Sequence, residues 1–439
     1  MAQPGRGAAA GGETSILTVA LCFCVAVFEG IDLQAAGVAA PKLGPAFHMS
    51  PGQLGWFFSA STFGLMLGAA VGGRLSDRFG RKAVLIGALA FFGLLTVATA
   101  LSPSVTWLLT NRFLTGVGLG GALPNVLALT AENTAPNRRN TAVGALYGGM
   151  PTGGALASLV SVFGASGDWR LVFYLGGFAP LLLAPVLYFL LPDSRELNRA
   201  KQAAGAEGLH PRSVGFALLG ESRAARTILL WVAFFLSLLT MYVLLNWLPS
   251  LMVSRGLSRP SASWVQMAFN LCGALASAVT GMTMDRLPLN KVVFGSFLLA
   301  AVGLVVLWLA PVALAISVVV GGVVGATISA TQALLYSLAP ATYPTQVRGT
   351  GVGAAVAVGR LGSAVGPLLA AALLGSGGSP QQVLMVLIPI ILCGGAAALI
   401  LSFLIGGRRR SPLRAGRRFP PQSSAPSGRT DQGRVPRMA

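Results

Sequence analysis

TSILTVALCFCVAVFEGIDLQAAGVAA, residues 14–40, is apolar over most of its length but contains two acidic residues, Glu29 and Asp32. About 20 apolar residues are enough for a helix to cross the hydrocarbon core of a bilayer. A charged group at that depth is costly, so acids inside membrane helices usually serve a function. The segment therefore predicts a first membrane helix, not a cleaved signal peptide, that contributes to a solute pathway.

The composition extends this prediction to the whole chain. Of the 439 residues, 54% are hydrophobic and only 10% are charged, whereas soluble domains carry about 25% charged residues. Apolar runs as long as 228–248 and 383–405 recur, while the strands of a membrane β-barrel would be short and alternating. We expect an all-α membrane protein that crosses the lipid bilayer many times.

The apolar runs predict twelve membrane helices in two six-helix bundles. We expect the helices at residues 15–40, 51–72, 83–102, 104–130, 141–164, 170–191, 227–252, 260–284, 292–310, 312–338, 349–374 and 381–406. The bundles then occupy 15–191 and 227–406. A short tail, 1–14, precedes them and a polar linker, 192–226, joins them. A basic tail, 407–439, follows and is expected to be disordered because it is rich in Arg, Pro, Ser and Gly.

The basic residues set the predicted orientation. Most of the 31 Lys and Arg residues fall in the tails, the linker and the loops on the side of both termini, and the opposite side receives Lys42, Arg170, Arg255 and Arg259. By the positive-inside rule, both termini are expected in the cytoplasm, with the protein in the inner (cytoplasmic) cell membrane. This distribution accounts for the net charge of +19 without nucleic-acid binding.

Short motifs of the first half recur in the second half at nearly the same offset. GRLSDRFGRK, 73–82, is echoed by GMTMDRL, 281–287, and RNTAVG, 139–144, is echoed by RGTGVG, 348–353. Repeats in matching loops indicate duplication. Two parallel six-helix repeats with a binding site near the bilayer midplane are typical of secondary transporters.

These motifs also carry a family resemblance. Twelve helices with GRLSDRFGRK between the second and third resemble the major facilitator superfamily. FEGIDLQAAGVAAP, NRFLTGVGLGGALPN and VRGTGVGAAVAVGRLG, which begin at Phe28, Asn111 and Val347, are similar to its aromatic acid:proton symporters, most of all to transporters of 3-(3-hydroxyphenyl)propionate. Many of these carry Asp-Gly-x-Asp in the first helix, where this chain has Glu29-Gly30-Ile31-Asp32. The resemblance implies a major facilitator fold, a monomer, and uptake of aromatic acids for catabolism.

Glu29 and Asp32 are three residues apart and share a helix face. Two nearby carboxylates in a medium of low dielectric constant do not both ionise cheaply, so one is expected to hold a proton. We predict that Glu29 or Asp32 couples transport to protons; the residues alone do not distinguish the two acids. The proton gradient would drive the process, with no cofactor and no metal. A structural ion pair or a water-exposed helix end is the alternative.

Arg112 and Arg360 lie near the middle of their predicted helices. An arginine at this depth needs a cavity or an acidic partner, and its planar guanidinium binds carboxylates, often through two hydrogen bonds. We predict that both bind the substrate carboxylate, in competition with Glu29 or Asp32. A permanent salt bridge is the alternative. Arg112 also matches an arginine motif in the fourth helix of the family.

Other polar and aromatic side chains are candidates for the wall of the binding site, because an aromatic acid needs a stacking surface and a few hydrogen-bonding groups. They are Tyr147, Asn246, Gln266, Asn270 and Gln332, with Tyr242, Trp247 and Tyr336 as further candidates. Trp247 is equally compatible with an anchor at the membrane interface.

The loop motif predicts a gate on the cytoplasmic side. Asp77, Arg78 and Arg81 are expected to form a latch with a neighbouring helix end, and substrate and proton would bias its opening. A charged turn that only sets the topology is the alternative.

The preferred function is proton-coupled import of an aromatic carboxylate by alternating access. The alternative is an antiporter that exports lipophilic compounds; the glycines of GGMPTGG, 148–154, favour it and the two midplane arginines disfavour it. A sensor or scaffold without transport has less support, since no signalling domain is apparent. The sequence offers no nucleophile–base set, metal-ligand spacing or ATP-binding motif, so we do not expect an enzyme.

Overall fold

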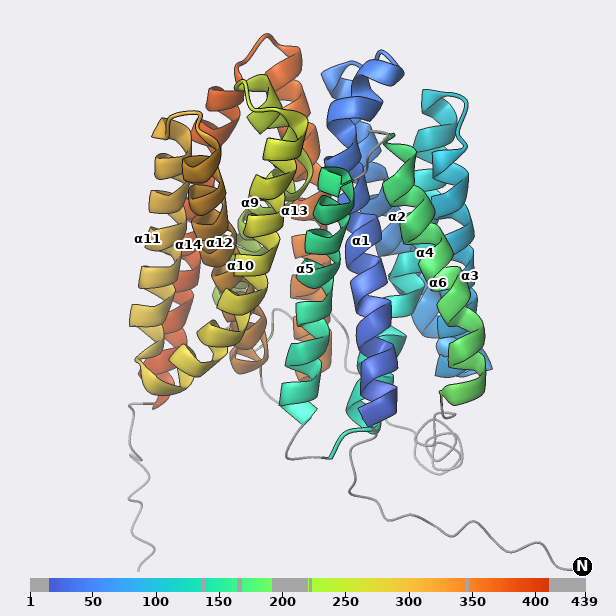
Figure 1. The fold of residues 1–439 in the computed structure, drawn as a ribbon. Coiled ribbons are helices and arrows are strands. Elements are labelled where there is room, and N and C mark those ends of the chain that lie inside the picture. The colour runs from blue at the N-terminus through green and yellow to red at the C-terminus, as the bar shows by residue number, and fades with distance from the viewer. Residues whose placement is uncertain are drawn as a thin grey trace, which may run out of the picture.

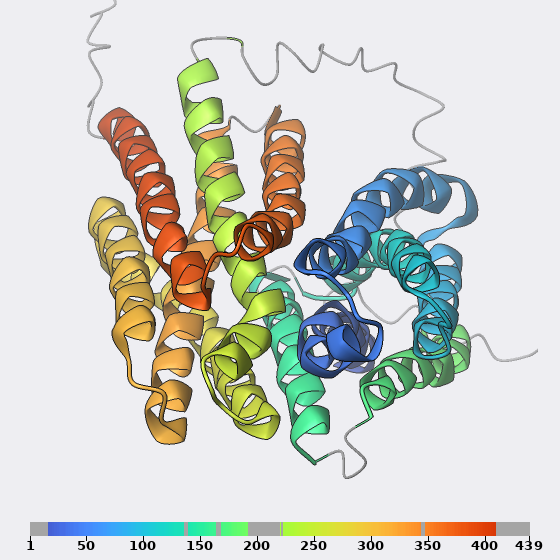
Figure 2. The ribbon, with the colours of Figure 1, turned by 90° about the horizontal axis from the view of Figure 1, so that it is seen from above.

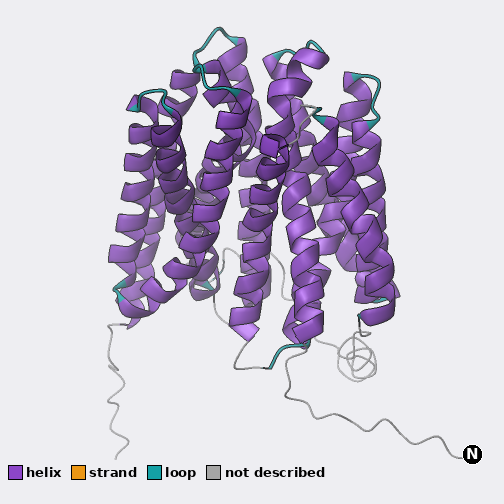
Figure 3. Ribbon diagram, viewed as in Figure 1, coloured by secondary structure: helices purple, strands orange, loops and turns teal. Residues whose placement is uncertain are grey.

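The computed structural model describes residues 16–135, 139–163, 168–191, 220, 223–343 and 347–409. Within these residues the chain forms twelve α-helices and no strand (Figure 3). The first six are α1 (Ile16–Ala46), α2 (Pro51–Phe79), α3 (Arg81–Ala100), α4 (Val105–Glu132), α5 (Arg139–Phe163) and α6 (Arg170–Leu190). The last six are α9 (Ala224–Ser254), α10 (Arg259–Arg286), α11 (Leu289–Leu309), α12 (Leu314–Thr342), α13 (Arg348–Gly375) and α14 (Pro380–Arg409).

The helices form two bundles, α1–α6 and α9–α14, which lie side by side when seen from above (Figure 2). The bundles meet mainly where α5 packs on α10, α2 on α13 and α1 on α9. Helix α1 begins and α14 ends at the lower end in Figure 1, which we call the terminal end; the opposite end is the far end. The prediction of an all-α protein with two six-helix bundles is confirmed.

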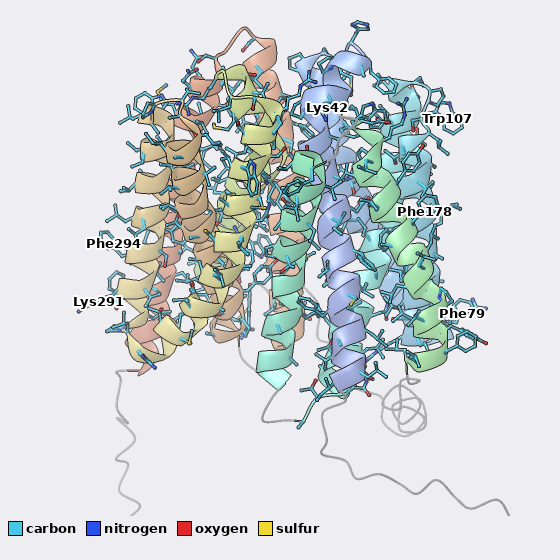
Figure 4. The ribbon with its side chains drawn as sticks, viewed as in Figure 1. Lys42, Phe79, Trp107, Phe178, Lys291 and Phe294 are labelled. Atoms are coloured by element: carbon cyan, nitrogen blue, oxygen red, sulfur yellow. The ribbon has the colours of Figure 1, made fainter. Side chains whose placement is uncertain are left out.

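The outer surface suits a lipid environment. Large apolar side chains project away from the bundles, among them Trp107, Phe178 and Phe294, each more than half exposed (Figure 4). Among the described residues, eleven helices are long and apolar enough to cross a membrane. The twelfth, α5, holds the glycine-rich run GGMPTGG and packs between α1 and α10.

Several helices are longer than the sequence predicts. Helix α1 continues through Pro41 and Pro45 to Ala46, as membrane helices tolerate proline where neighbouring groups satisfy the freed backbone. Helix α2 runs on to Phe79, so the predicted loop shrinks to Gly80, whose φ of 92° lies in a region that favours glycine.

Two predicted domain boundaries also shift. Helix α9 starts at Ala224, inside the predicted linker 192–226, and α14 reaches Arg409, inside the predicted tail 407–439. The rest of that tail, the N-terminal tail and most of the linker lie outside the described residues. Their predicted disorder and solvation therefore stay predictions.

Glycines allow α2 and α4 to pack backbone against backbone. A Cβ atom at Gly64 would overlap the carbonyl oxygen of Phe113, and one at Gly116 would overlap that of Ser61. Small residues are the usual means of close approach between membrane helices, because lipid provides no hydrophobic driving force for their association. The α2–α4 contact thus depends on the absence of side chains at these positions.

We expect Gly64→Ala to destabilise the protein by about 1–3 kcal/mol, the usual range for overpacking. Gly73→Ala is the matched control on the same helix, because a Cβ there would meet nothing within 4 Å. Thermal unfolding of the purified variants in detergent measures the difference. Equal unfolding midpoints for the two variants would contradict the role of the α2–α4 contact.

Candidate substrate and proton site

Two side-chain hydrogen bonds between the bundles join their far halves. The Ser59 hydroxyl of α2 donates to the carbonyl of Ala364 on α13 at 2.7 Å. The Ser263 hydroxyl of α10 bonds that of Ser161 on α5 at 3.1 Å. All four residues lie between the middle and the far end of their helices. The centre of the bundle interface therefore lies beneath a closed far side.

Asp32 is held by a buried ion pair within the first bundle. Nη1 of Arg112, on α4, donates to both carboxylate oxygens of Asp32 at 3.0 and 2.9 Å, and its Nη2 donates to the Asp32 carbonyl at 3.2 Å. The Thr96 hydroxyl of α3 adds a bond of 2.7 Å. The rings of Phe57 and Phe173 lie 5.9 and 6.0 Å from the guanidinium. This geometry corresponds to the structural salt bridge that the sequence left as an alternative.

Glu29 lies less than one turn earlier on α1 and is in a different situation. Its side chain is fully buried, yet neither carboxylate oxygen has a hydrogen-bond partner among the described residues. Arg360, on α13 of the other bundle, is close enough to act on it electrostatically, as is Asp32 on the same helix. The two acids that the sequence could not distinguish thus differ clearly. Asp32 is paired within a bundle, whereas Glu29 has no hydrogen-bond partner among the described residues and interacts electrostatically with a cation of the other bundle.

Arg360 lies among tyrosines. It is half-buried, and its Nη1 donates to the hydroxyl of Tyr242 at 2.8 Å. The rings of Tyr147 and Tyr336 lie 5.7 Å apart across the bundle interface, and both interact electrostatically with Arg360. Each tyrosine offers a flat apolar face and a polar tip. The structure therefore brings Glu29, Arg360 and the predicted Tyr147 together.

On the far side of this group lies a cluster of buried carboxamides, Gln34, Gln266 and Asn270, which we call the amide layer. The side chains of Gln34 and Asn270 exchange two hydrogen bonds, of 2.7 and 2.6 Å, between the bundles. Nε2 of Gln266 donates to Oε1 of Gln34 at 3.2 Å and to the Leu245 carbonyl at 3.4 Å. Gln266 and Asn270 were predicted from the sequence; Gln34 was not.

The remaining wall candidates form hydrogen bonds outside the amide layer. Gln332 donates to the Ser237 hydroxyl at 2.8 Å, and Asn246 donates to the Tyr242 carbonyl of its own helix at 2.9 Å. Trp247 is buried and donates to the carbonyl of Pro367 at 3.1 Å. Trp247 therefore packs between helices and is not an anchor at the membrane interface.

The motif residues lie at the terminal end of the first bundle. Arg81 forms an ion pair with Glu132, the last residue of α4, an acid that the sequence analysis did not single out. Arg78 is exposed, with its guanidinium 5.2 Å from the Phe79 ring. The side chain of Asp77 lies outside the described part of the structure. The gating role of the three residues stays a prediction.

Comparison with known proteins places the chain among transporters. The family model of the Major Facilitator Superfamily matches residues 22–259 and 230–430. The 3-(3-hydroxy-phenyl)propionate transporter of Escherichia coli is 43% identical over 360 residues, which cover 81% of this chain and 86% of that protein. The 4-hydroxybenzoate transporter PcaK of Pseudomonas aeruginosa is 36% identical, covering 81% and 85%. The gallate transporter of Pseudomonas putida is 32% identical over the same shares.

Solved structures share the fold. A D-xylose-proton symporter superposes with a TM-score of 0.70 at 19% identity, covering 88% of this chain and 97% of that one. A bacterial homologue of the human lysosomal transporter Spinster gives 0.68 at 16% identity, covering 90% and 98%. The named relatives are transporters, and this protein is not an enzyme. The match over nearly its whole length shows that the chain belongs to the major facilitator superfamily.

Proposed function

We propose that this protein imports an aromatic carboxylate together with protons across the inner (cytoplasmic) cell membrane. One observation carries the proposal: the Arg360 guanidinium lies at the bundle interface among Tyr147, Tyr242 and Tyr336. A guanidinium binds a carboxylate, and tyrosine faces bind an aromatic ring. The three relatives named above, which are transporters of hydroxylated aromatic acids by name, support this substrate class.

Within this proposal the exchangeable proton belongs to Glu29. A buried carboxylate without hydrogen-bond donors is unfavourable, so ionised Glu29 depends on Arg360. A substrate carboxylate that binds Arg360 removes this compensation and favours protonated Glu29. Substrate and proton would then load together. Asp32, held by Arg112 and Thr96, instead fixes the position of α1.

Alternating access follows from the two bundles. Because the far halves of the bundles are bonded together, we take the terminal end as the side from which the site would be reached. With both termini in the cytoplasm, as the basic loops predict, this arrangement corresponds to the conformation that releases substrate into the cell. We propose that a monomer is sufficient, because the interface between the two bundles lies within one chain.

The glycines that favoured a drug exporter have a packing role. A Cβ at Gly153 would overlap the Val27 carbonyl, and one at Gly30 would overlap the carbonyl of Met150. These contacts hold α5 against α1. The geometry therefore gives the exporter alternative no separate support.

The first test is uptake of labelled 3-(3-hydroxyphenyl)propionate into proteoliposomes. We expect accumulation when the outside is acidic and its loss with a protonophore. Arg360→Gln should reduce uptake at least about a hundredfold. Without the guanidinium, the site no longer offsets the cost of removing the substrate carboxylate from water. Lys291→Gln is the control, because it removes one charge from an exposed surface position (Figure 4). Unchanged uptake by Arg360→Gln would exclude Arg360 as the anion site.

The second test separates proton coupling from substrate binding. Glu29→Gln mimics the protonated acid, so we expect exchange of labelled for unlabelled substrate to persist while accumulation driven by a pH gradient disappears. Exchange does not require Glu29 to gain or lose a proton, whereas net uptake coupled to protons requires both steps. Gradient-driven accumulation at the wild-type level in this variant would contradict the proposed role of Glu29.

The third test concerns Asp32 and Arg112. Removing one partner of a buried ion pair typically costs about 3–5 kcal/mol, because the other charge stays buried without compensation. We expect Asp32→Asn to lower the thermal stability of the purified protein, and the double variant Asp32→Asn/Arg112→Gln to recover part of the loss. Glu29→Gln, which breaks no hydrogen bond, is the control. Equal stability of the single and double variants would contradict a structural ion pair.

A further inference from the structure

The amide layer contains a buried acceptor that nothing in the described residues satisfies. Gln266 is 0% exposed, and its Nε2 is used by the Gln34 side chain and the Leu245 carbonyl. Its Oε1 has no hydrogen-bond partner. The neighbouring amides of Gln34 and Asn270 bond one another. A buried polar group without a partner calls for a specific explanation.

The chemistry of this acceptor selects the kind of ligand. A carbonyl oxygen attracts a hydrogen-bond donor and repels a carboxylate, which only accepts. A neutral hydroxyl can donate to it without bringing a charge into the layer. Gln34 and Asn270 are also nearly fully buried, at 5% and 2% exposure, which keeps competing water from much of the layer. A ring hydroxyl of a transported aromatic acid meets these requirements.

The spacing fits the two ends of one small molecule. Gln34 follows Glu29 by five residues on α1, about 7.5 Å along the helix at 1.5 Å per residue. On α9, the Tyr242 hydroxyl contacts Arg360 and the Leu245 carbonyl contacts Gln266. Tyr242 and Leu245, which contact Arg360 and Gln266, are thus less than one helical turn apart on α9. An aromatic acid with its carboxylate at Arg360 would extend its ring beside Tyr242 toward the amide layer.

We infer that the amide layer is the subsite for the ring hydroxyl, with Oε1 of Gln266 as the acceptor. The inference rests on the proposed function and adds the residue that selects hydroxylated substrates. Since Gln34 belongs to one bundle and Gln266 and Asn270 to the other, a hydroxyl bound there lies against the contact that closes the far side. Recognition of the ring and closure of the far side then involve the same side chains.

The test compares three ligands on the full-length protein in proteoliposomes: 3-(3-hydroxyphenyl)propionate, 3-phenylpropionate and the 3-methoxyphenyl analogue. For the wild type, we expect kcat/KM for the hydroxylated acid to exceed that for each of the others at least about tenfold, because a site built to bond a hydroxyl rejects ligands without the donor. Methionine is similar to glutamine in volume but apolar. Gln266→Met should therefore bring the ratio of kcat/KM between the hydroxylated acid and each of the other two ligands close to one.

Ser263→Ala is the matched control on α10. It removes a neighbouring bond between the bundles, to Ser161, outside the amide layer, and should keep the wild-type ratio. A wild-type ratio near one overturns the inference, and so does an unchanged ratio in Gln266→Met. Loss of the ratio in Gln332→Met alone also overturns it. Oε1 of Gln332 likewise has no partner within the described part of the chain and would then be the acceptor.

The ligand series on the wild-type protein tests the subsite even when Gln266→Met does not fold. A wild-type protein that transports none of the three acids overturns the proposed function, whereas transport of all three without preference overturns only the hydroxyl subsite.

Discussion

The ion pair between Asp32 and Arg112 determines what the rest of the first helix can do. It fixes α1 against α4, with further support from Thr96 on α3. A helix turns about 100° per residue, so Glu29 is displaced by about 60° around the axis and about 4.5 Å along it. Asp32 is bonded to α4 of its own bundle, whereas Glu29 interacts electrostatically with Arg360 of the second bundle. The same sequence motif thereby contains one acid held in an ion pair, Asp32, and one acid without a hydrogen-bond partner among the described residues, Glu29.

The distribution of charge between bundles decides which pair can respond to alternating access. Asp32 and Arg112 belong to one bundle and move together, so their interaction changes little when the bundles rock. Glu29 and Arg360 belong to different bundles, so rocking changes the distance between them. A ligand or proton shifts a conformational equilibrium only through unequal interaction with the two states. The charges across the bundle interface can provide this difference, whereas a pair inside a bundle cannot.

Much of the fold could be predicted from the sequence, because apolar length directly encodes a membrane helix. The extension of α1 past Pro41 could not, since it depends on neighbouring helices. The central position of Arg112 and Arg360 along their helices could be predicted as well, but the neighbour that each one contacts could not. Gln34 was missed because an uncharged amide hardly interrupts an apolar segment. Its importance comes from Gln266 and Asn270, which lie more than two hundred residues away in the chain.

The far side is closed by neutral groups, and this suits an interface that must open in every transport cycle. The backbones of the two bundles come close where a Cβ at Gly37 would crowd the Leu245 carbonyl. Hydrogen bonds between neutral side chains in membrane proteins contribute only about 0.6 kcal/mol on average. The amide layer can therefore exchange one partner for another at low cost, whereas the charged Asp32–Arg112 pair cannot. The Asp32–Arg112 contact within the first bundle uses charge, whereas the contacts that close the far side use hydroxyls, carboxamides and the close backbone approach at Gly37.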